Sequence, residues 1–422
     1  MSPFQFQPGE DFALAMDERD PLKEFRGRFW YPKAAGADCV YLCGHSLGLQ
    51  PKTAAAYIAQ ELKDWAELGV EGHFRATNPW VPYHRLLAEQ TAELLGAKPF
   101  EVVVMNSLTV NLHLMMVSFY RPTREKHKIV IERGAFPSDQ YAVQSQIRFH
   151  GLDPETSLIE LTPLPGESCL REEEIESLIQ QREDIALIML GGVNYATGQA
   201  LNLARLTQAG HKRGCVVGFD LAHAAGNVPL KLHAWAPDFA VWCSYKYLNG
   251  GPGCPGGCFV HERHARAWDL PRFGGWWGHD ERSRFQMGPD FQPMPGADGW
   301  QLSNPSIVSL AVLRASMDLF QEAGMDRLRA KSESLTAYME YLAGQNAPRK
   351  LSIITPREKE RRGAQLSFRI EEKGKNLCES LAHQGFIGDW REPDIFRVAP
   401  VPMYNSYHDV FRFIQRLAST IG

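Results

Sequence analysis

Short apolar segments alternate with helical patterns from about residue 50 to residue 300. The expected strands cover 101–105, 128–132, 157–161, 185–190, 215–220 and 239–243. Helical patterns such as 171–181 and 202–214 lie between them. Segments that are apolar throughout fit strands buried on both faces, and parallel strands need crossover connections, usually helices. The alternation therefore predicts an α/β fold with a mostly parallel sheet sandwiched between helices.

The pattern changes after residue 305. A long helical region (306–344) precedes short apolar segments, a helix near 374–385 and a final helix. We expect a large domain of residues 51–305, and a smaller α+β domain formed by 1–50 and 306–422. The segment 273–300 is rich in Gly and aromatic residues without a clear period. A long loop of this kind is often functional.

Composition narrows the class of protein. The chain has 422 residues, a formal net charge of -4, 44% hydrophobic residues and 22% charged residues. These are ordinary values for a globular protein, and they indicate neither nucleic-acid nor membrane binding. No apolar run reaches the roughly 18–20 residues of a membrane helix, and the N-terminus lacks a signal pattern, so we expect a cytoplasmic location. The C-x3-C pairs Cys39/Cys43 and Cys254/Cys258 lack typical zinc-site spacing, so we expect reduced thiols and no metal.

Lys246 follows the apolar strand 239–243, where a buried charge is costly. Such a lysine either extends to solvent or acts as a nucleophilic amine in a desolvated pocket. Asp220 ends the strand 215–220, and a buried carboxylate needs a cationic partner. In open α/β sheets, ligands bind at the carboxyl ends of the strands. An Asp that holds a protonated pyridine nitrogen, with a Lys that forms a Schiff base, fits pyridoxal phosphate.

Two expected helices begin beside the same edge of the sheet. Leu108 and Thr109 follow the strand 101–105, and free N–H groups at a helix start suit a phosphate. Phe136 follows the strand 128–132, with Ser138 and Asp139 in the next helical turn. Taken singly, these are ordinary helix starts, where an acidic residue is favoured by the helix dipole. Together with the paired lysine and aspartate they favour a cofactor site, with the Phe136 ring stacked on a flat ligand.

Several stretches resemble kynureninase, within the aspartate aminotransferase-like, fold-type I pyridoxal phosphate enzymes. The most specific are "GFDLAHAAGNV" (218–228), "WCSYKYLNGGPG" (242–253) and "RVAPVPMYNSYHDV" (397–410), and "GHSLGLQP", "FPSD", "GGWWGH" and "LSNP" add to the match. The resemblance covers most of the chain, and it implies that the sheet of the large domain is of the seven-stranded type. It implies a homodimer with shared active sites. It also implies hydrolysis of L-kynurenine or 3-hydroxy-L-kynurenine to anthranilate or 3-hydroxyanthranilate plus L-alanine.

The resemblance also implies residue roles. Lys246 would form the Schiff base, Asp220 would pair with the pyridinium, and Tyr245 would bind the phosphate and pass a proton. The cofactor would also contact Leu108, Thr109, Phe136, Ser138, Asp139 and His223, with Trp276 and Asn304 supplied by the neighbouring subunit. The substrate would contact Ser46, His73, Ser303, Asn304 and Arg397. Arg397 would clamp the α-carboxylate, which suits its planar fork. The resemblance leaves the role of Asp139 open.

Substrate preference and competing functions depend on few residues. His73 and Asn304 match the type that favours the 3-hydroxy substrate, which hints at NAD biosynthesis in addition to tryptophan catabolism. An ordinary loop histidine is the alternative for His73.

A cysteine desulfurase would need a nucleophilic cysteine on a late loop, and the sequence has none between Cys258 and Cys378. A generic aminotransferase would not explain the specific stretches. A pyridoxal phosphate-binding regulator would need a DNA-binding domain or basic patch, and neither is evident.

Overall fold

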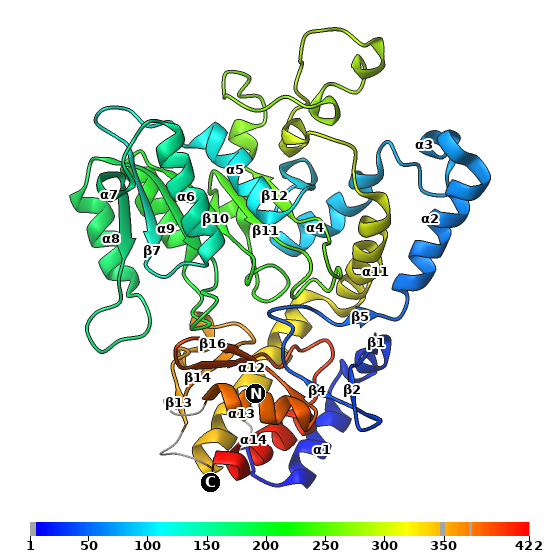
Figure 1. Cartoon of the computed structure of the whole chain (residues 1–422), viewed down its shortest axis with the longest axis vertical. Coiled ribbons are helices and arrows are strands. Elements are labelled where there is room, and N and C mark those ends of the chain that lie inside the picture. Colours follow the sequence, from blue (N-terminus) through cyan, green and yellow to red (C-terminus); the bar gives the residue numbers. More distant parts are fainter. Residues whose placement is uncertain (1–5, 347–350, 371–373, 422) are drawn as a thin grey trace.

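A computed structural model describes residues 6–346, 351–370 and 374–421 of the chain (Figure 1). Its centre is a seven-stranded sheet. In spatial order the strands are β6 (Val102–Val104), β12 (Gly257–Val260), β11 (Phe239–Trp242), β10 (Val216–Asp220), β9 (Ile185–Gly191), β7 (Lys128–Glu132) and β8 (Leu158–Leu161). Only β12 runs antiparallel to its neighbours. The mostly parallel α/β sheet is therefore confirmed. The sequence pattern missed β12, which follows a run of Gly and Pro.

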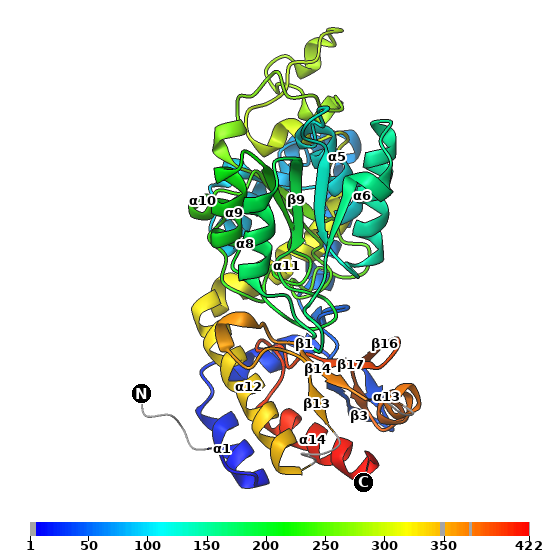
Figure 2. The same cartoon turned by 90° about the vertical axis from the view of Figure 1, so that its left-hand side faces the viewer.

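Helices cover both faces of this sheet, as Figure 2 shows. One face carries α5 (Leu108–Phe119) and α6 (Pro137–Phe149), and the other carries α8 (Glu172–Gln181), α9 (Leu203–Lys212) and α10 (Leu232–Trp235). The short α7 (Pro154–Ser157) precedes β8. In α9 the buried residues Leu203, Leu206 and Ala209 recur every three positions. This spacing places them on one face of the helix, which packs against the sheet.

A second group of helices packs beside β6 and β12. It contains α2 (Ala54–Leu68), α3 (Gly72–Arg75), α4 (Ala88–Leu95) and α11 (Ile307–Ala323). The helix expected from residue 51 begins three residues later, because Pro51 belongs to the short strand β5 (Gln50–Pro51), which pairs with β1 (Phe29–Trp30). The hairpin β2 (Lys33–Ala34) and β3 (Ala37–Asp38) lies nearby in the N-terminal segment.

The remaining elements form a smaller α+β unit that contains both ends of the described chain (Figure 1). Its antiparallel sheet has the order β13 (Ser352–Ile353), β14 (Leu366–Arg369), β17 (Ile395–Val398) and β16 (Asp389–Arg391). Its helices are α1 (Glu10–Arg19), α12 (Met325–Asn346), α13 (Gly374–His383) and α14 (Tyr407–Ile421). The strand β4 (Val40–Tyr41) pairs with β15 (Phe386–Ile387), which ties the N-terminal segment to this unit.

The long helical region after residue 305 is two helices. α11 ends at Ala323, and Gly324 has a φ of 74°, a left-handed conformation that favours glycine. α11 packs against α2, whereas α12 packs against α14. The division of the chain into domains stays a prediction, and this packing favours a boundary near Gly324 instead of residue 305.

The Gly- and aromatic-rich segment forms a projecting loop with short 3₁₀ turns (Figure 1). Several of its large apolar side chains are exposed, among them Trp276, Phe285 and Met287. All eight cysteines are free thiols, and all except Cys169 are buried. Among the described residues, none of the helices is both long enough and apolar enough to cross a bilayer.

Candidate active site

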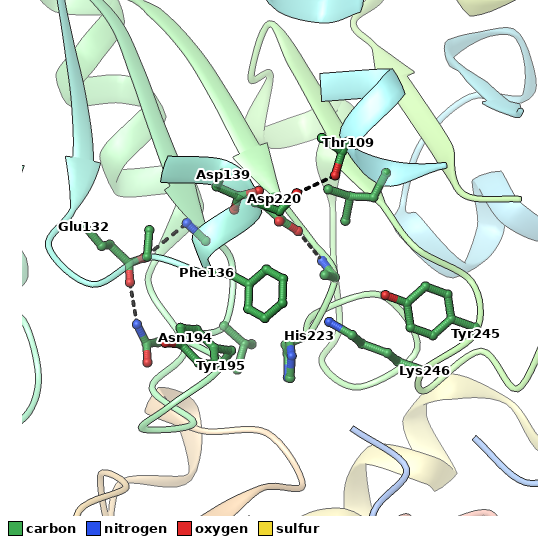
Figure 3. Close-up of a pocket in the computed structure, with 16 residues that line it drawn as sticks. Thr109, Glu132, Phe136, Asp139, Asn194, Tyr195, Asp220, His223, Tyr245 and Lys246 are labelled. Atoms are coloured by element: carbon green, nitrogen blue, oxygen red, sulfur yellow. Dashed lines mark hydrogen bonds between the residues drawn. The ribbon is translucent and has the colours of Figure 1, made fainter. Parts of the chain in front are cut away.

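A cavity opens at the carboxyl ends of the central strands (Figure 3). This edge of an α/β sheet is where ligands bind. The lining of the cavity includes Leu108, Thr109, Glu132, Phe136, Ser138, Asp139, Asn194, Tyr195, Asp220, His223, Tyr245 and Lys246. Every residue that the sequence placed around the cofactor from within one subunit therefore lines this one cavity.

Lys246 points into the cavity from a closed turn after β11 (Figure 3). Its Nζ lies 5.7 Å from the ring centroid of Phe136 and 5.9 Å from that of Tyr245. The turn is fixed by backbone hydrogen bonds: Gly250 N–H donates to the Ser244 carbonyl (2.8 Å), and Gly48 N–H donates to the Tyr245 carbonyl (2.8 Å). The amine is therefore held in the cavity and does not extend to bulk solvent.

Two carboxyl groups meet on the opposite wall. Asp220 ends β10, and its Oδ1 accepts the Ala222 N–H (2.6 Å). Asp139 belongs to the first turn of α6; burial and the neighbouring Asp220 carboxylate raise its pKa well above the ordinary value. Both causes favour the protonated form of Asp139. Its Oδ1 is buried without a partner among the described residues. This pair fits a protonated pyridine nitrogen.

The starts of α5 and α6 converge on a third side of the cavity (Figure 3). The Thr109 and Ser138 hydroxyls lie 2.6 Å apart. The side chain of Ser107 makes no capping bond at the start of α5, so N–H groups of its first turn are available to an anion. Burial raises the pKa of Tyr245 above its ordinary value, so its hydroxyl is a donor at neutral pH. These groups fit the phosphate of pyridoxal phosphate.

Aromatic side chains bound the space between these groups. Phe136 is 44% exposed, and its ring meets the ring of Tyr195 edge-on at 5.4 Å. His223 is buried. Burial, with the charges of Lys246 and Arg397, holds the pKa of His223 well below its ordinary value, so the imidazole is neutral. A neutral ring and an exposed phenyl face fit a flat heteroaromatic ligand.

The structure does not bring the other predicted residues into this cavity. Arg397 is 1% exposed, and its guanidinium carbon lies 5.8 Å from the ring centroid of Tyr195, so it is next to the cavity wall. Ser46 lies in the loop between β4 and β5 and is absent from the lining. His73, Trp276, Ser303 and Asn304 are also absent from the lining of this chain's cavity, within the ranges the structure covers.

Sequence reasoning missed three residues of the lining that bear on its geometry. Glu132 ends β7 and accepts the Gly191 N–H (3.1 Å) and the Asn194 side-chain N–H (2.5 Å). Burial raises the pKa of Glu132. Glu132 gives the same signal as Asp220, a carboxylate at the end of an apolar strand. Asn194 and Tyr195 follow β9 in a turn without a distinctive pattern, and they could not have been selected.

Comparisons with known proteins agree with this geometry. Residues 328–417 match the family model of the kynureninase C-terminal domain. The chain is 64% identical over its full length to the full-length kynureninase of Koribacter versatilis. It is 57% identical to that of Myxococcus xanthus, over 99% of this chain and 98% of the relative.

Solved structures agree on the fold. A cysteine desulfurase of Thermococcus onnurineus is similar, with a TM-score of 0.76 and 17% identity over 91% of this chain and 94% of that chain. A mutant of C-DES with glycine covalently linked to its pyridoxal phosphate cofactor has a TM-score of 0.75 at 17% identity, over 90% and 97%. The fold-type I architecture is thus confirmed, and the full-length relatives decide between families that share it. The chain belongs to the kynureninase family of pyridoxal phosphate-dependent hydrolases, which cleave a carbon–carbon bond.

Proposed function

We propose that the protein hydrolyses 3-hydroxy-L-kynurenine, and L-kynurenine less efficiently, to the aromatic acid and L-alanine. The observation that carries this function is the position of Lys246 and Asp220 in one cavity. The full-length identity to kynureninases supports it independently. The reaction adds one water to the substrate, breaks its β–γ bond and needs no oxidant.

When bound, pyridoxal phosphate supplies an aldehyde for covalent attachment and an electron-withdrawing ring. Lys246 is the residue that would hold it, and its amine is placed to remove the substrate's α-proton once it is free. Asp220, with Asp139 beside it, would keep the ring nitrogen protonated. Tyr245 is protonated because burial raises its pKa, so it is the candidate general acid. Thr109 and Ser138 would bind the phosphate.

The substrate's carboxylate needs a cation beside the cavity. Arg397 lies at its wall and donates from Nη1 to the Tyr195 carbonyl (2.6 Å). A planar guanidinium suits a bidentate carboxylate contact. We assign Arg397 this role, and Ser46, in the neighbouring loop, a supporting contact.

His73 supports the preference for the 3-hydroxy substrate. Its Nδ1 lies 3.0 Å from the Val70 carbonyl. Because a carbonyl only accepts, the neutral ring carries its proton on Nδ1, which leaves Nε2 as an acceptor. A phenolic hydroxyl is a donor that fits this nitrogen. Ser303 and Asn304 would complete the contact with the hydroxylated ring.

A homodimer with shared sites would explain where the remaining residues lie. His73, Trp276, Ser303 and Asn304 are away from this chain's own cavity. A series of aromatic rings runs from Phe74, the chain neighbour of His73, to Trp276. The ring centroids of Phe74 and Phe285 lie 6.0 Å apart, and those of Phe285 and Trp276 lie 5.5 Å apart. All three rings are exposed. Contiguous exposed apolar side chains are typical of an interface. We infer that this surface meets the cavity of a second copy.

The test is steady-state hydrolysis of both substrates by the cofactor-loaded protein. We expect both to be cleaved, with the higher kcat/KM for 3-hydroxykynurenine. Lys246→Ala is expected to lose turnover and covalent attachment of the cofactor. His73→Phe is expected to lower kcat/KM for the hydroxylated substrate by roughly tenfold and to change it little for kynurenine, because one hydrogen bond is lost. Preference for kynurenine in the wild type would refute the substrate assignment, and no cleavage of either would refute the function.

A further inference from the structure

The strand next to the one that carries Arg397 holds a partly buried carboxylate opposite it. Asp389 on β16 and Arg397 on β17 are direct cross-strand partners, so their side chains lie on the same face of the sheet. Arg397 Nε donates to Asp389 Oδ1 (2.7 Å), and Arg397 Nη2 donates to Oδ2. One edge of the guanidinium is therefore fully occupied by Asp389.

Asp389 is itself held by His45. His45 is completely buried, and its Nε2 lies 3.2 Å from Asp389 Oδ1. Burial, with the charge of Arg397, lowers the pKa of His45 to about 4, so a neutral ring donates this hydrogen bond at neutral pH. The Arg391 Nη2 also donates to Asp389 Oδ2 (3.0 Å). Four donors thus fix both oxygens of the carboxylate.

The second edge of the guanidinium faces the large unit. Arg397 Nη1 donates to the carbonyl of Tyr195, whose ring lines the cavity. An arginine has five N–H groups. Within the described part of the chain, these contacts leave one N–H on each terminal nitrogen for a ligand. With His45 neutral, Arg391, Arg397 and Asp389 carry a net positive charge, which suits an anion beside the cavity.

We propose that Asp389, supported by His45, is a positioning residue that fixes the rotation of Arg397, so that its free terminal N–H groups receive the substrate's α-carboxylate. This rests on the role of Arg397 given under the proposed function. Cys43, His45 and Asp389 also lie close enough together to suggest a metal site. The guanidinium of Arg397 already contacts both oxygens of Asp389. A metal ion would have to displace it, so a metal site is unfavourable here.

The experiment compares ligands that differ only in the carboxylate. L-alanine and ethylamine are titrated into the holoprotein and followed by cofactor absorbance, and KM for kynurenine is measured separately. Asp389→Asn is expected to raise the Kd of L-alanine and the KM of kynurenine by roughly tenfold, as for a lost charge-assisted pair. The Kd of ethylamine should stay within about twofold, because it makes no contact with Arg397.

Two further variants separate positioning from damage to the fold. His45→Gln keeps the Asp389–Arg397 pair and is expected to produce a smaller effect that is again confined to L-alanine. In an Arg397→Ala background, Asp389→Asn should add nothing to the Kd of L-alanine, because residues that act as one unit are non-additive. Asp394→Asn is the matched control, since Asp394 pairs with Arg369 on the same sheet (3.0 Å) and should leave both ligands unaffected.

The outcomes are distinct. Equal weakening of both ligands, an unchanged Kd for L-alanine, or tighter binding of L-alanine after Asp389→Asn would each overturn the positioning role. Tighter binding would mean that Asp389 competes with the ligand. Failure of the wild type to cleave kynurenine would refute the proposed function instead, and the alanine and ethylamine titrations would still decide the role of Asp389.

Discussion

Aspartate residues in this chain show how surroundings set the chemistry of one side chain. Asp139 is buried beside another carboxylate, which raises its pKa. Asp238 is equally buried, yet it accepts hydrogen bonds from His211 (3.0 Å), His264 (2.8 Å) and Arg263 (2.7 Å). Burial alone would raise the pKa of Asp238, but these partners outweigh it and hold the pKa well below the ordinary value of 3.8. Asp139 thus fits the proposed ligand site, whereas the carboxylate of Asp238 is held by partners within the fold.

Asp238→Asn is expected to lower the unfolding free energy at pH 7 by roughly 1.5–3 kcal/mol, because the buried carboxylate of Asp238 is lost as a charged acceptor for Arg263, His211 and His264. A folded-state pKa below the unfolded one stabilises the fold above the unfolded pKa, and this contribution is lost as pH falls toward the folded pKa. The difference between variant and wild type should thus shrink below about pH 4. Urea denaturation at pH 7 and pH 3 measures this difference in unfolding free energy.

Asp38→Asn, in an exposed pair with Lys33, is the control and should cost under about 1 kcal/mol. An equal difference at both pH values would contradict the assignment.

The loop before β5 supports the turn that carries Lys246. Gly48 donates its N–H to the Tyr245 carbonyl (2.8 Å). A Cβ on Gly48 would lie 2.4 Å from the Lys246 carbonyl oxygen and 2.3 Å from Asn249 Oδ1. These contacts are too short for any side chain, so glycine is required here for close approach and not for its backbone angles. The stretch "GHSLGLQP" therefore bears on the site through packing as well as through Ser46.

Gly48→Ala is expected to shift the Lys246 turn and to lower kcat by roughly 10- to 100-fold, as misplacement of a reacting group by about 1 Å does. Stopped-flow turnover and the rate of cofactor attachment measure the effect. The control is Gly27→Ala, because Gly27 has open space around it and no left-handed backbone. Wild-type kcat in Gly48→Ala would show that the turn tolerates the displacement.

The strands also show which parts of the fold the sequence could predict. The strands around Asp220 and Lys246 were found because they are apolar, with Asp220 at the end of the first and Lys246 shortly after the second. β12 was not, because Gly and Pro precede it and its pairing with β6 comes from far along the chain. Asp389 could not be selected either, since its role depends on a cross-strand register between two short strands. The local pattern of apolar residues identifies buried strands. The pairing of segments that are distant in the sequence can be read only from the folded structure.

For the whole molecule, most of the predicted site residues fall into two groups in space, and Arg397 and Ser46 belong to neither. One lines the cavity of the chain, and the other, with His73 and Trp276, lies near exposed aromatic rings of the projecting loop and α3 (Figure 1). The family resemblance assigns Trp276 and Asn304 to the neighbouring subunit, but spacing along the chain alone does not show which copy supplies a residue, and His73 and Ser303 received no such assignment. If the sites are shared, each needs a cavity from one chain and a loop from its partner.

Hybrid dimers test this arrangement. Lys246→Ala removes the cavity's amine, and a second chain carrying Trp276→Ala and Asn304→Ala removes the loop's contribution, so each homodimer should have little or no activity. After denaturation together and refolding, about half of the dimers are mixed and each has one intact site, so we expect about a quarter of wild-type activity. Lys246→Ala refolded with Asp220→Ala is the control and should recover none, because every site then lacks a cavity residue. No recovery in the first mixture would show that each site is built from one chain.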